Sequence, residues 1–214
     1  FMSQDVSLQI ETLETRASAE SGESKRLLLG KAAQVADAGG ASSAEVARLY
    51  INAASNDPFN PATYWSIGRT LEQTDAHALI SESLAEMATD DSESPWIAHK
   101  AMFDAHHIQE DRRLDGTLRD LVRKNEELYL WQVYRYVDLG KWRNVQQVFT
   151  EQSGGDRAEG ARQTAYFAQG MHVDSQQIAD LWKSVYQSNR DDLEAQEALV
   201  PLYKELGKWK EYAE

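Results

Sequence analysis

The sequence contains no cysteine, and only 4 of its 214 residues are proline and 12 are glycine. The lack of cysteine excludes disulfides, thiolate nucleophiles, iron–sulfur clusters and thiolate zinc sites. It leaves the compartment open, and we expect a soluble protein for which the cytoplasm is favoured over the periplasm. No stretch approaches the ~18 consecutive apolar residues of a membrane-spanning helix, so we expect no membrane insertion.

Positive charge is also scarce. The chain has 22 Lys and Arg against 35 Asp and Glu, a formal net charge of −13. Such a surface repels nucleic-acid phosphates and anionic lipid. We therefore expect no nucleic acid as partner.

Large aromatic residues are plentiful, with 6 Trp and 9 Tyr. Together with few helix breakers, they favour helices packed on helices. Apolar residues recur with the helical period of 3.6 in several segments, such as Val46, Leu49, Tyr50 and Ala53. No run of alternating β-branched residues predicts a strand. The sequence therefore predicts an all-α fold.

An internal repeat organises this helical pattern. The segments 136–142 and 203–209 both have the form Tyr-x-x-Leu-Gly-Lys-Trp and lie 67 residues apart. Pro61 and Pro95 lie 34 residues apart, and proline suits the first turn of a helix. Both spacings fit a unit of about 34 residues.

The repeat predicts one domain over residues 1–214, built as a right-handed α-solenoid of stacked antiparallel helix pairs. A lone helix near 4–19 is expected to precede pairs at 24–55, 61–89, 94–124, 127–151, 159–187 and 194–214, the last incomplete. The segment Gly207–Glu214 has the pattern of a turn followed by the start of another helix. We therefore expect the chain to be a fragment of a longer protein.

At these residues the chain resembles the tetratricopeptide repeat (TPR) family, whose unit of ~34 residues pairs two helices. The residues that carry the resemblance are Tyr64, Trp65, Ile67, Gly68, Tyr136, Gly140, Trp142, Phe149, Leu199, Tyr203, Gly207 and Trp209. The chain departs from the family where large residues replace small ones on the second helix, at Ile80, Val145, Ile178 and Tyr212. Two other architectures stay open, an α-solenoid of another type and a helical bundle without repeats.

The resemblance implies a concave groove lined by the first helix of each unit, which takes an extended peptide or a partner helix. Carrying the groove positions over gives Trp65, Arg69, Glu72, Ile97, Asp104, Leu130, Tyr134, Asp138 and Phe167. Aromatic residues at a groove centre tend to dominate binding energy. The carboxylates beside them would steer a basic or amphipathic partner. The alternative is that these residues are partly core and otherwise ordinary surface.

No catalytic motif is present: the sequence has neither Gly-x-Ser-x-Gly nor His-Glu-x-x-His. His99 and His106 share a helix face with Glu110 one turn beyond, but two turns separate the histidines by ~10 Å. We therefore expect polar surface or hydrogen bonds between helices there and no metal site. The acidic pairs 90–91 and 191–192 are expected to be turn or helix-cap residues.

These observations predict a protein–protein interaction scaffold that binds a peptide or helix in its groove, without catalytic residues, metal or cofactor. The alternative is a regulatory or recruitment region of a larger multidomain enzyme whose catalytic part lies outside these residues. A third class, an autonomous helical enzyme or small-molecule binder, is also open. The oligomeric state cannot be derived from the sequence.

Overall fold

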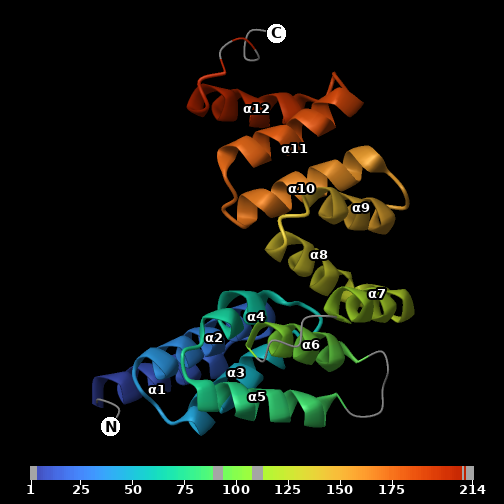
Figure 1. Cartoon of the computed structure of the whole chain (residues 1–214). Coiled ribbons are helices and arrows are strands. Elements are labelled where there is room, and N and C mark those ends of the chain that lie inside the picture. Colours follow the sequence, from blue (N-terminus) through green and yellow to red (C-terminus); the bar gives the residue numbers. More distant parts are fainter. Residues whose placement is uncertain (1–3, 89–93, 108–112, 209, 211–214) are drawn as a thin grey trace. The chain divides into compact units, whose positions relative to one another are not determined.

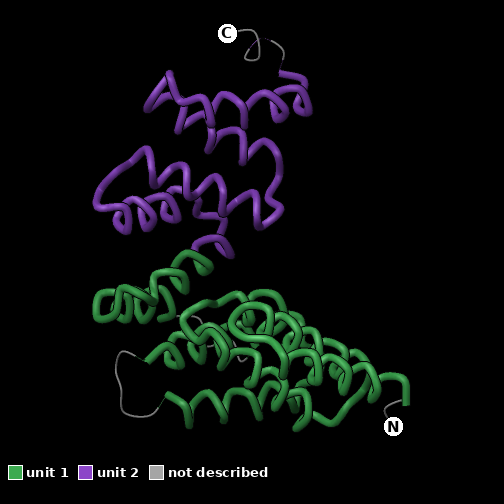
Figure 2. Tube along the Cα trace, turned by 180° about the vertical axis from the view of Figure 1, so that it is seen from behind, with its two compact units in different colours: residues 1–135 green, residues 136–214 purple. Residues whose placement is uncertain are grey.

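The computed structural model describes residues 4–88, 94–107, 113–208 and 210 (Figure 1). All regular structure in this part of the chain is helical, so the predicted all-α class is confirmed. The chain divides into two compact units, residues 1–135 (unit 1) and residues 136–214 (unit 2) (Figure 2).

Unit 1 contains short and long helices. They are α1 (Gln4–Ser18), α2 (Gly22–Ala38), α3 (Ser43–Ala54), α4 (Ala62–Ser66), the 3₁₀-helix η1 (Gly68–Thr70), α5 (Thr74–Met87), α6 (Pro95–His107), α7 (Leu114–Lys124) and the 3₁₀-helix η3 (Glu126–Leu128). Helix α8 (Tyr129–Asp138) begins in unit 1 and ends in unit 2.

The helices of unit 2 are more uniform in length. They are α9 (Trp142–Gln152), α10 (Arg157–Gly170), α11 (Ser175–Ser188) and α12 (Leu193–Glu205).

Helices next to each other in the sequence pack together. In unit 1, α2 contacts both α1 and α3, and α3 contacts α5 beyond the short α4. In unit 2, α10 contacts α9 and α11, and α11 contacts α12. Helices α2 and α3 cover the range 24–55 expected for one pair, and α10 and α11 cover 159–187. The stacking of all pairs into one right-handed solenoid stays a prediction, and residues 89, 108–112, 209 and 211–214 of the expected pairs lie outside the described residues.

The core of unit 1 contains large aromatic side chains from several helices. Tyr50, Tyr64, Phe103 and Trp131 are fully buried there. The core of unit 2 is smaller and centres on Trp182, with Ile178, Val185 and Leu199 packed around it. Trp131 and Trp182 therefore fill the space between packed helices.

The two Tyr-x-x-Leu-Gly-Lys-Trp segments end their helices in the same way. Gly140 and Gly207 both have φ +66°, which is the left-handed conformation that glycine adopts most easily. The next amide then donates to the carbonyl five residues back, Lys141 to Tyr136 and Lys208 to Tyr203, both at 2.8 Å. This is the Schellman ending of a helix. Trp209, the last residue of the second segment, lies outside the described residues.

Aspartates begin three successive helices of unit 2. The carboxylates of Asp156, Asp174 and Asp192 accept backbone amides in the first turns of α10, α11 and α12. Each of these amides would otherwise lack a partner within its helix. The expected capping role of the pair 191–192 is thus confirmed for Asp192, whereas the pair 90–91 lies outside the described residues.

Candidate functional site

Three of the expected groove residues meet in unit 1. The rings of Trp65 on α4 and Tyr134 on α8 make an edge-to-face contact, with centroids 5.1 Å apart. The guanidinium carbon of Arg69, on η1, lies 3.8 Å from the centroid of the Trp65 ring. Aromatic pairs and cation–π contacts of this kind each contribute about 0.5–1.5 kcal/mol beyond simple burial. We call Trp65, Arg69 and Tyr134 the aromatic cluster.

The short length of α4 brings this cluster together. The helix begins after Pro61, and the side chain of Asn60 accepts the Ala62 amide at 3.0 Å. It ends after Ser66, and the chain continues into η1 before turning extended at Leu71. Trp65 and Arg69 are four residues apart across this break, yet the guanidinium still covers the indole ring.

Histidines of α5 and α6 hold the segment that carries Arg69. The Nε2 atoms of His107, His106 and His77 lie 2.6, 3.2 and 2.9 Å from the carbonyl oxygens of Gly68, Arg69 and Leu71. A carbonyl only accepts, so each of these nitrogens carries the proton and donates. Three donors from two helices therefore fix the backbone of η1.

Burial keeps His107 neutral near pH 7. Burial lowers the pKa of His107 to about 4; the neighbouring His77 and His106 also lower it, while the hydrogen bond to the Gly68 carbonyl opposes the shift. The rings of His77 and His107 stack with centroids 3.9 Å apart. Protonation of both rings would place two like charges in contact.

A second buried histidine lies deeper in unit 1. His99 of α6 is only 2% exposed, and its Nε2 lies 2.5 Å from the hydroxyl oxygen of Tyr50 on α3. Burial lowers the pKa of His99 to about 3 and raises the pKa of Tyr50. His99 also packs against the indole of Trp131, with ring centroids 4.9 Å apart. These contacts join helices, as expected from the sequence, while Glu110 lies outside the described residues.

Tyr134 is 9% exposed, and burial raises the pKa of its phenol. The positive charge of Arg26, on α2, acts in the opposite direction and lowers that pKa. Arg26 is 5% exposed, and its Nη1 lies 3.5 Å from the hydroxyl oxygen of Thr63. Arg26 therefore contacts α4, the helix that carries Trp65.

The other expected groove residues of unit 1 have different surroundings. Glu72 is exposed and lines an open pocket together with Lys31 and Leu71. Asp104 is buried, accepts a hydrogen bond from Ser81 at 2.7 Å and pairs with Lys100. It therefore joins α5 to α6 instead of presenting a carboxylate to solvent, as it would on a groove rim. Ile97 and Leu130 are half-buried, and Ile97 packs against the core of unit 1.

Two expected groove residues belong to unit 2. Asp138 is exposed at the end of α8. Phe167 of α10 is half-buried, and its ring centroid lies 5.7 Å from that of Phe149 on α9. A groove that continues through both units stays a prediction.

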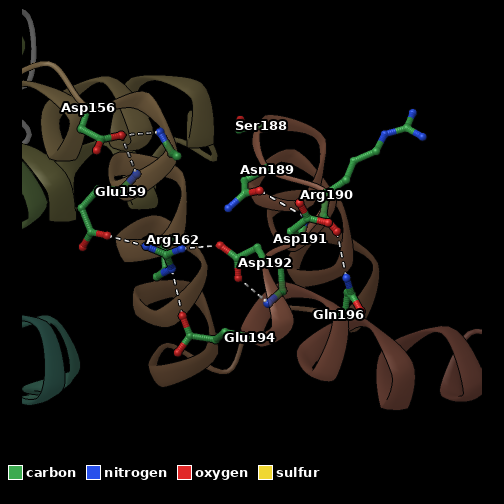
Figure 3. A network of polar contacts seen from close by, with 12 residues as sticks. Asp156, Glu159, Arg162, Ser188, Asn189, Arg190, Asp191, Asp192, Glu194 and Gln196 are labelled. Atoms are coloured by element: carbon green, nitrogen blue, oxygen red, sulfur yellow. Dashed lines mark hydrogen bonds and ion pairs between the residues drawn. The ribbon is translucent and has the colours of Figure 1, made fainter.

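Unit 2 has its own polar network, centred on Arg162 of α10 (Figure 3). The guanidinium contacts Glu159 at 2.7 Å, Glu194 at 2.9 Å and also Asp192. The hydroxyl of Tyr166, one helical turn further along α10, donates to Glu194. The network thus links α10 to the start of α12.

Neither unit shows the side chains of a metal centre. Within the described residues, no three His, Asp or Glu side chains gather closely enough to hold an ion. Over the same residues, no helix combines the length and the apolar character that crossing a lipid bilayer requires.

Comparisons with known proteins leave this site without a precedent. No protein-family model matches the chain, and neither a curated protein nor a solved structure matches it. The resemblance to TPR proteins therefore stays a prediction based on the repeat and its residues.

Sequence reasoning missed Arg26, and a signal for it was present. Arg26 occupies the apolar stripe of α2 that continues through Leu29, Ala33 and Ala36. A charged residue on such a stripe indicates a buried polar contact. The histidine contacts to residues 68–71 had no comparable signal, because the carbonyl partners lie in a different segment.

Proposed function

We propose that this chain is a non-enzymatic helical-repeat scaffold that binds a segment of a partner protein at the aromatic cluster of unit 1. The observation that carries the proposal is the contact of Trp65, Arg69 and Tyr134, which three separate segments bring together. Trp65 stays half-exposed although its ring packs on Tyr134. Tryptophan, tyrosine and arginine are the residue types that most often dominate protein interfaces.

The surroundings of the cluster suit a binding site more than a purely structural contact. The three histidine donors hold η1 in one position before any partner arrives. A site that is already ordered loses less conformational entropy on binding. Because the site is ordered before binding, contact with one face of Trp65 would give measurable affinity although the contact area is small.

A random library of 12-residue peptides displayed on phage, selected on the intact chain, tests this proposal. Each selected peptide is synthesised, labelled and titrated by fluorescence polarisation against the wild type, Trp65→Ala and Trp96→Ala. Trp96 is a matched control, because it is also half-buried but stacks on His99, with ring centroids 5.9 Å apart.

We expect Trp65→Ala to weaken binding at least tenfold, as loss of an aromatic anchor does, and Trp96→Ala to change it less than twofold. Circular dichroism checks that both variants stay helical. Peptides that bind both variants as tightly as the wild type would contradict the proposed site.

A further inference from the structure

The guanidinium of Arg26 has fewer partners than its burial requires. Among the described residues, its side-chain partners include Thr63, whose Oγ1 lies 3.5 Å from Nη1, and Glu23, whose Oε1 lies 3.6 Å from Nη2. The buried Nε has no hydrogen-bond partner in the described part of the chain. A buried cation without close hydrogen bonds is costly, and structures normally provide a carboxylate for it.

One edge of the buried Arg26 guanidinium lies close to the surface, because its Nη2 is 3.6 Å from the carboxylate of Glu23, which is 77% exposed. Thr63, the contact of Arg26 on α4, is two residues before Trp65. Arg26 thus contacts the helix that carries Trp65, and the guanidinium of Arg69 covers the Trp65 ring.

We propose that the ligand of the aromatic cluster is an acidic peptide segment, one carboxylate of which binds the guanidinium of Arg26 while a neighbouring apolar side chain lies against Trp65. This inference rests on the proposed function and names the chemistry of its partner. The planar fork of arginine matches a carboxylate with two parallel hydrogen bonds. It also reverses the charge of the partner expected from the overall acidity of the chain.

In the free protein, the carboxylate of Glu23 is only a weak partner for the guanidinium of Arg26. This carboxylate is mostly exposed and 3.6 Å away, a separation longer than a hydrogen bond. Glu23 therefore does not give the buried guanidinium the close hydrogen bonds that offset the cost of its burial. An incoming carboxylate that approaches closely therefore replaces Glu23 at small cost.

Two variants should have opposite effects on this binding. Arg26→Lys keeps the charge but removes the fork, so we expect acidic peptides to bind about tenfold more weakly. Glu23→Gln removes the competing carboxylate and leaves Arg26 in place, so we expect binding two- to fivefold tighter. Because Glu23 is exposed, this second variant keeps the test valid even where a change at Arg26 disturbs folding.

The test uses peptides selected from the random library on the intact chain. We expect them to be enriched in Asp or Glu next to an apolar residue. Replacing the acidic residue of a selected peptide by its amide should weaken binding and abolish the effects of both protein variants. In a ¹H–¹⁵N spectrum, the Arg26 Nε–H signal, assigned by its loss in Arg26→Lys, should move when the acidic peptide is added.

The outcomes distinguish a failure of this inference from a failure of the proposed function. Peptides that depend on Trp65 but carry basic or neutral residues, or that bind Arg26→Lys unchanged, overturn the inference and leave the proposed function standing. If no peptide depends on Trp65, the proposed function fails and the inference fails with it. Tighter binding by Glu23→Gln together with weaker binding by Arg26→Lys supports both.

Discussion

Unit 1 and unit 2 place their polar side chains in different ways. Unit 1 buries Arg26, His99 and Asp104 among its helices. In unit 2, the buried Asp192 caps the start of α12 and pairs with Arg162, whereas Glu159 of the same network is half-buried and Glu194 is exposed (Figure 3). Burying polar groups costs free energy unless they are fully paired. The Nε of Arg26 in unit 1 has no hydrogen-bond partner within the described residues, which points to a role beyond stability. That is why the candidate site lies there.

The units also differ in how their helices approach one another. In unit 2, a Cβ added at Gly160 of α10 would lie 2.7 Å from the backbone Cα and N atoms of Thr150 on α9. In unit 1, a Cβ added at Gly30 of α2 would meet only the end of the Ile67 side chain, at 2.4 Å. Backbone cannot move aside as a side chain can, so close packing is stricter in unit 2 at this point.

The largest expected effect follows from this difference. Gly160→Ala should lower the free energy of unfolding by about 3 kcal/mol, because α9 and α10 must separate. Gly30→Ala is the matched control. There the displacement of Ile67 is offset by the higher helix propensity of alanine, about 1 kcal/mol, so a change within about 1 kcal/mol of zero is expected. Urea unfolding measures both, and equal losses in the two variants would remove the distinction.

As the pH falls, unit 1 should lose stability at a higher pH than unit 2. His99 has a folded pKa of about 3 and a usual value of 6.5, so the unfolded chain takes up its proton first as the pH falls. The contribution of neutral His99 to the stability of the folded state is complete above pH 6.5 and is lost progressively as the pH falls towards 3. Between pH 7 and pH 5, His99 alone should lower the stability by about 2 kcal/mol, and His107 acts in the same direction.

Hydrogen exchange followed segment by segment checks this expectation. Amides of α6, which carries His99 and His107, should lose protection at pH 5, while amides of α11 should keep theirs after correction for the intrinsic exchange rate. His172, in unit 2, is exposed, so His172→Gln is a control that should leave the pH profile unchanged. Equal loss of protection in α6 and α11 would contradict a histidine origin.

The regularity of unit 2 explains which features the sequence could predict. The turn at Gly140 and the cap at Asp192 depend on hydrogen bonds within a few residues, and such contacts have local signatures. Trp65 and Tyr134 were both assigned to the groove from the resemblance to TPR proteins. The apolar stripe of α2 indicates that Arg26 is buried, but its partner Thr63 lies in a distant segment, as does the Gly68 partner of His107. The pairing of Asp104 with Ser81 likewise depends on how α5 packs on α6, so no local pattern indicates it.

The next prediction concerns the two roles of Asp192. Its carboxylate accepts the Ala195 amide at 3.0 Å and pairs with Arg162, and the backbone hydrogen bond is the main cause of its lowered pKa. Asp192→Ala should therefore lower the stability by about 1.5 kcal/mol. Asp174→Ala loses only a cap, so about 1 kcal/mol is expected. Thermal unfolding compares the pair, and a larger loss for Asp174→Ala would show that Arg162 adds nothing.

The smallest expected effect concerns a departure from the regular helix endings of unit 2. His172 has φ 53° at the end of α10, and the next amide, of Val173, donates to Ala168 at 3.2 Å. This is the ending seen at Gly140, but with a Cβ that disfavours the left-handed conformation. His172→Gly relieves that strain, which stabilises the folded state. Part of this stabilisation is offset because glycine has greater conformational freedom in the unfolded chain. The substitution should stabilise the protein by about 0.5–1 kcal/mol, and Gly140→His should destabilise it by a similar amount. Urea unfolding measures both variants. If their midpoints shift in the same direction, a non-glycine residue in the left-handed conformation does not carry the same free-energy cost at the two helix ends.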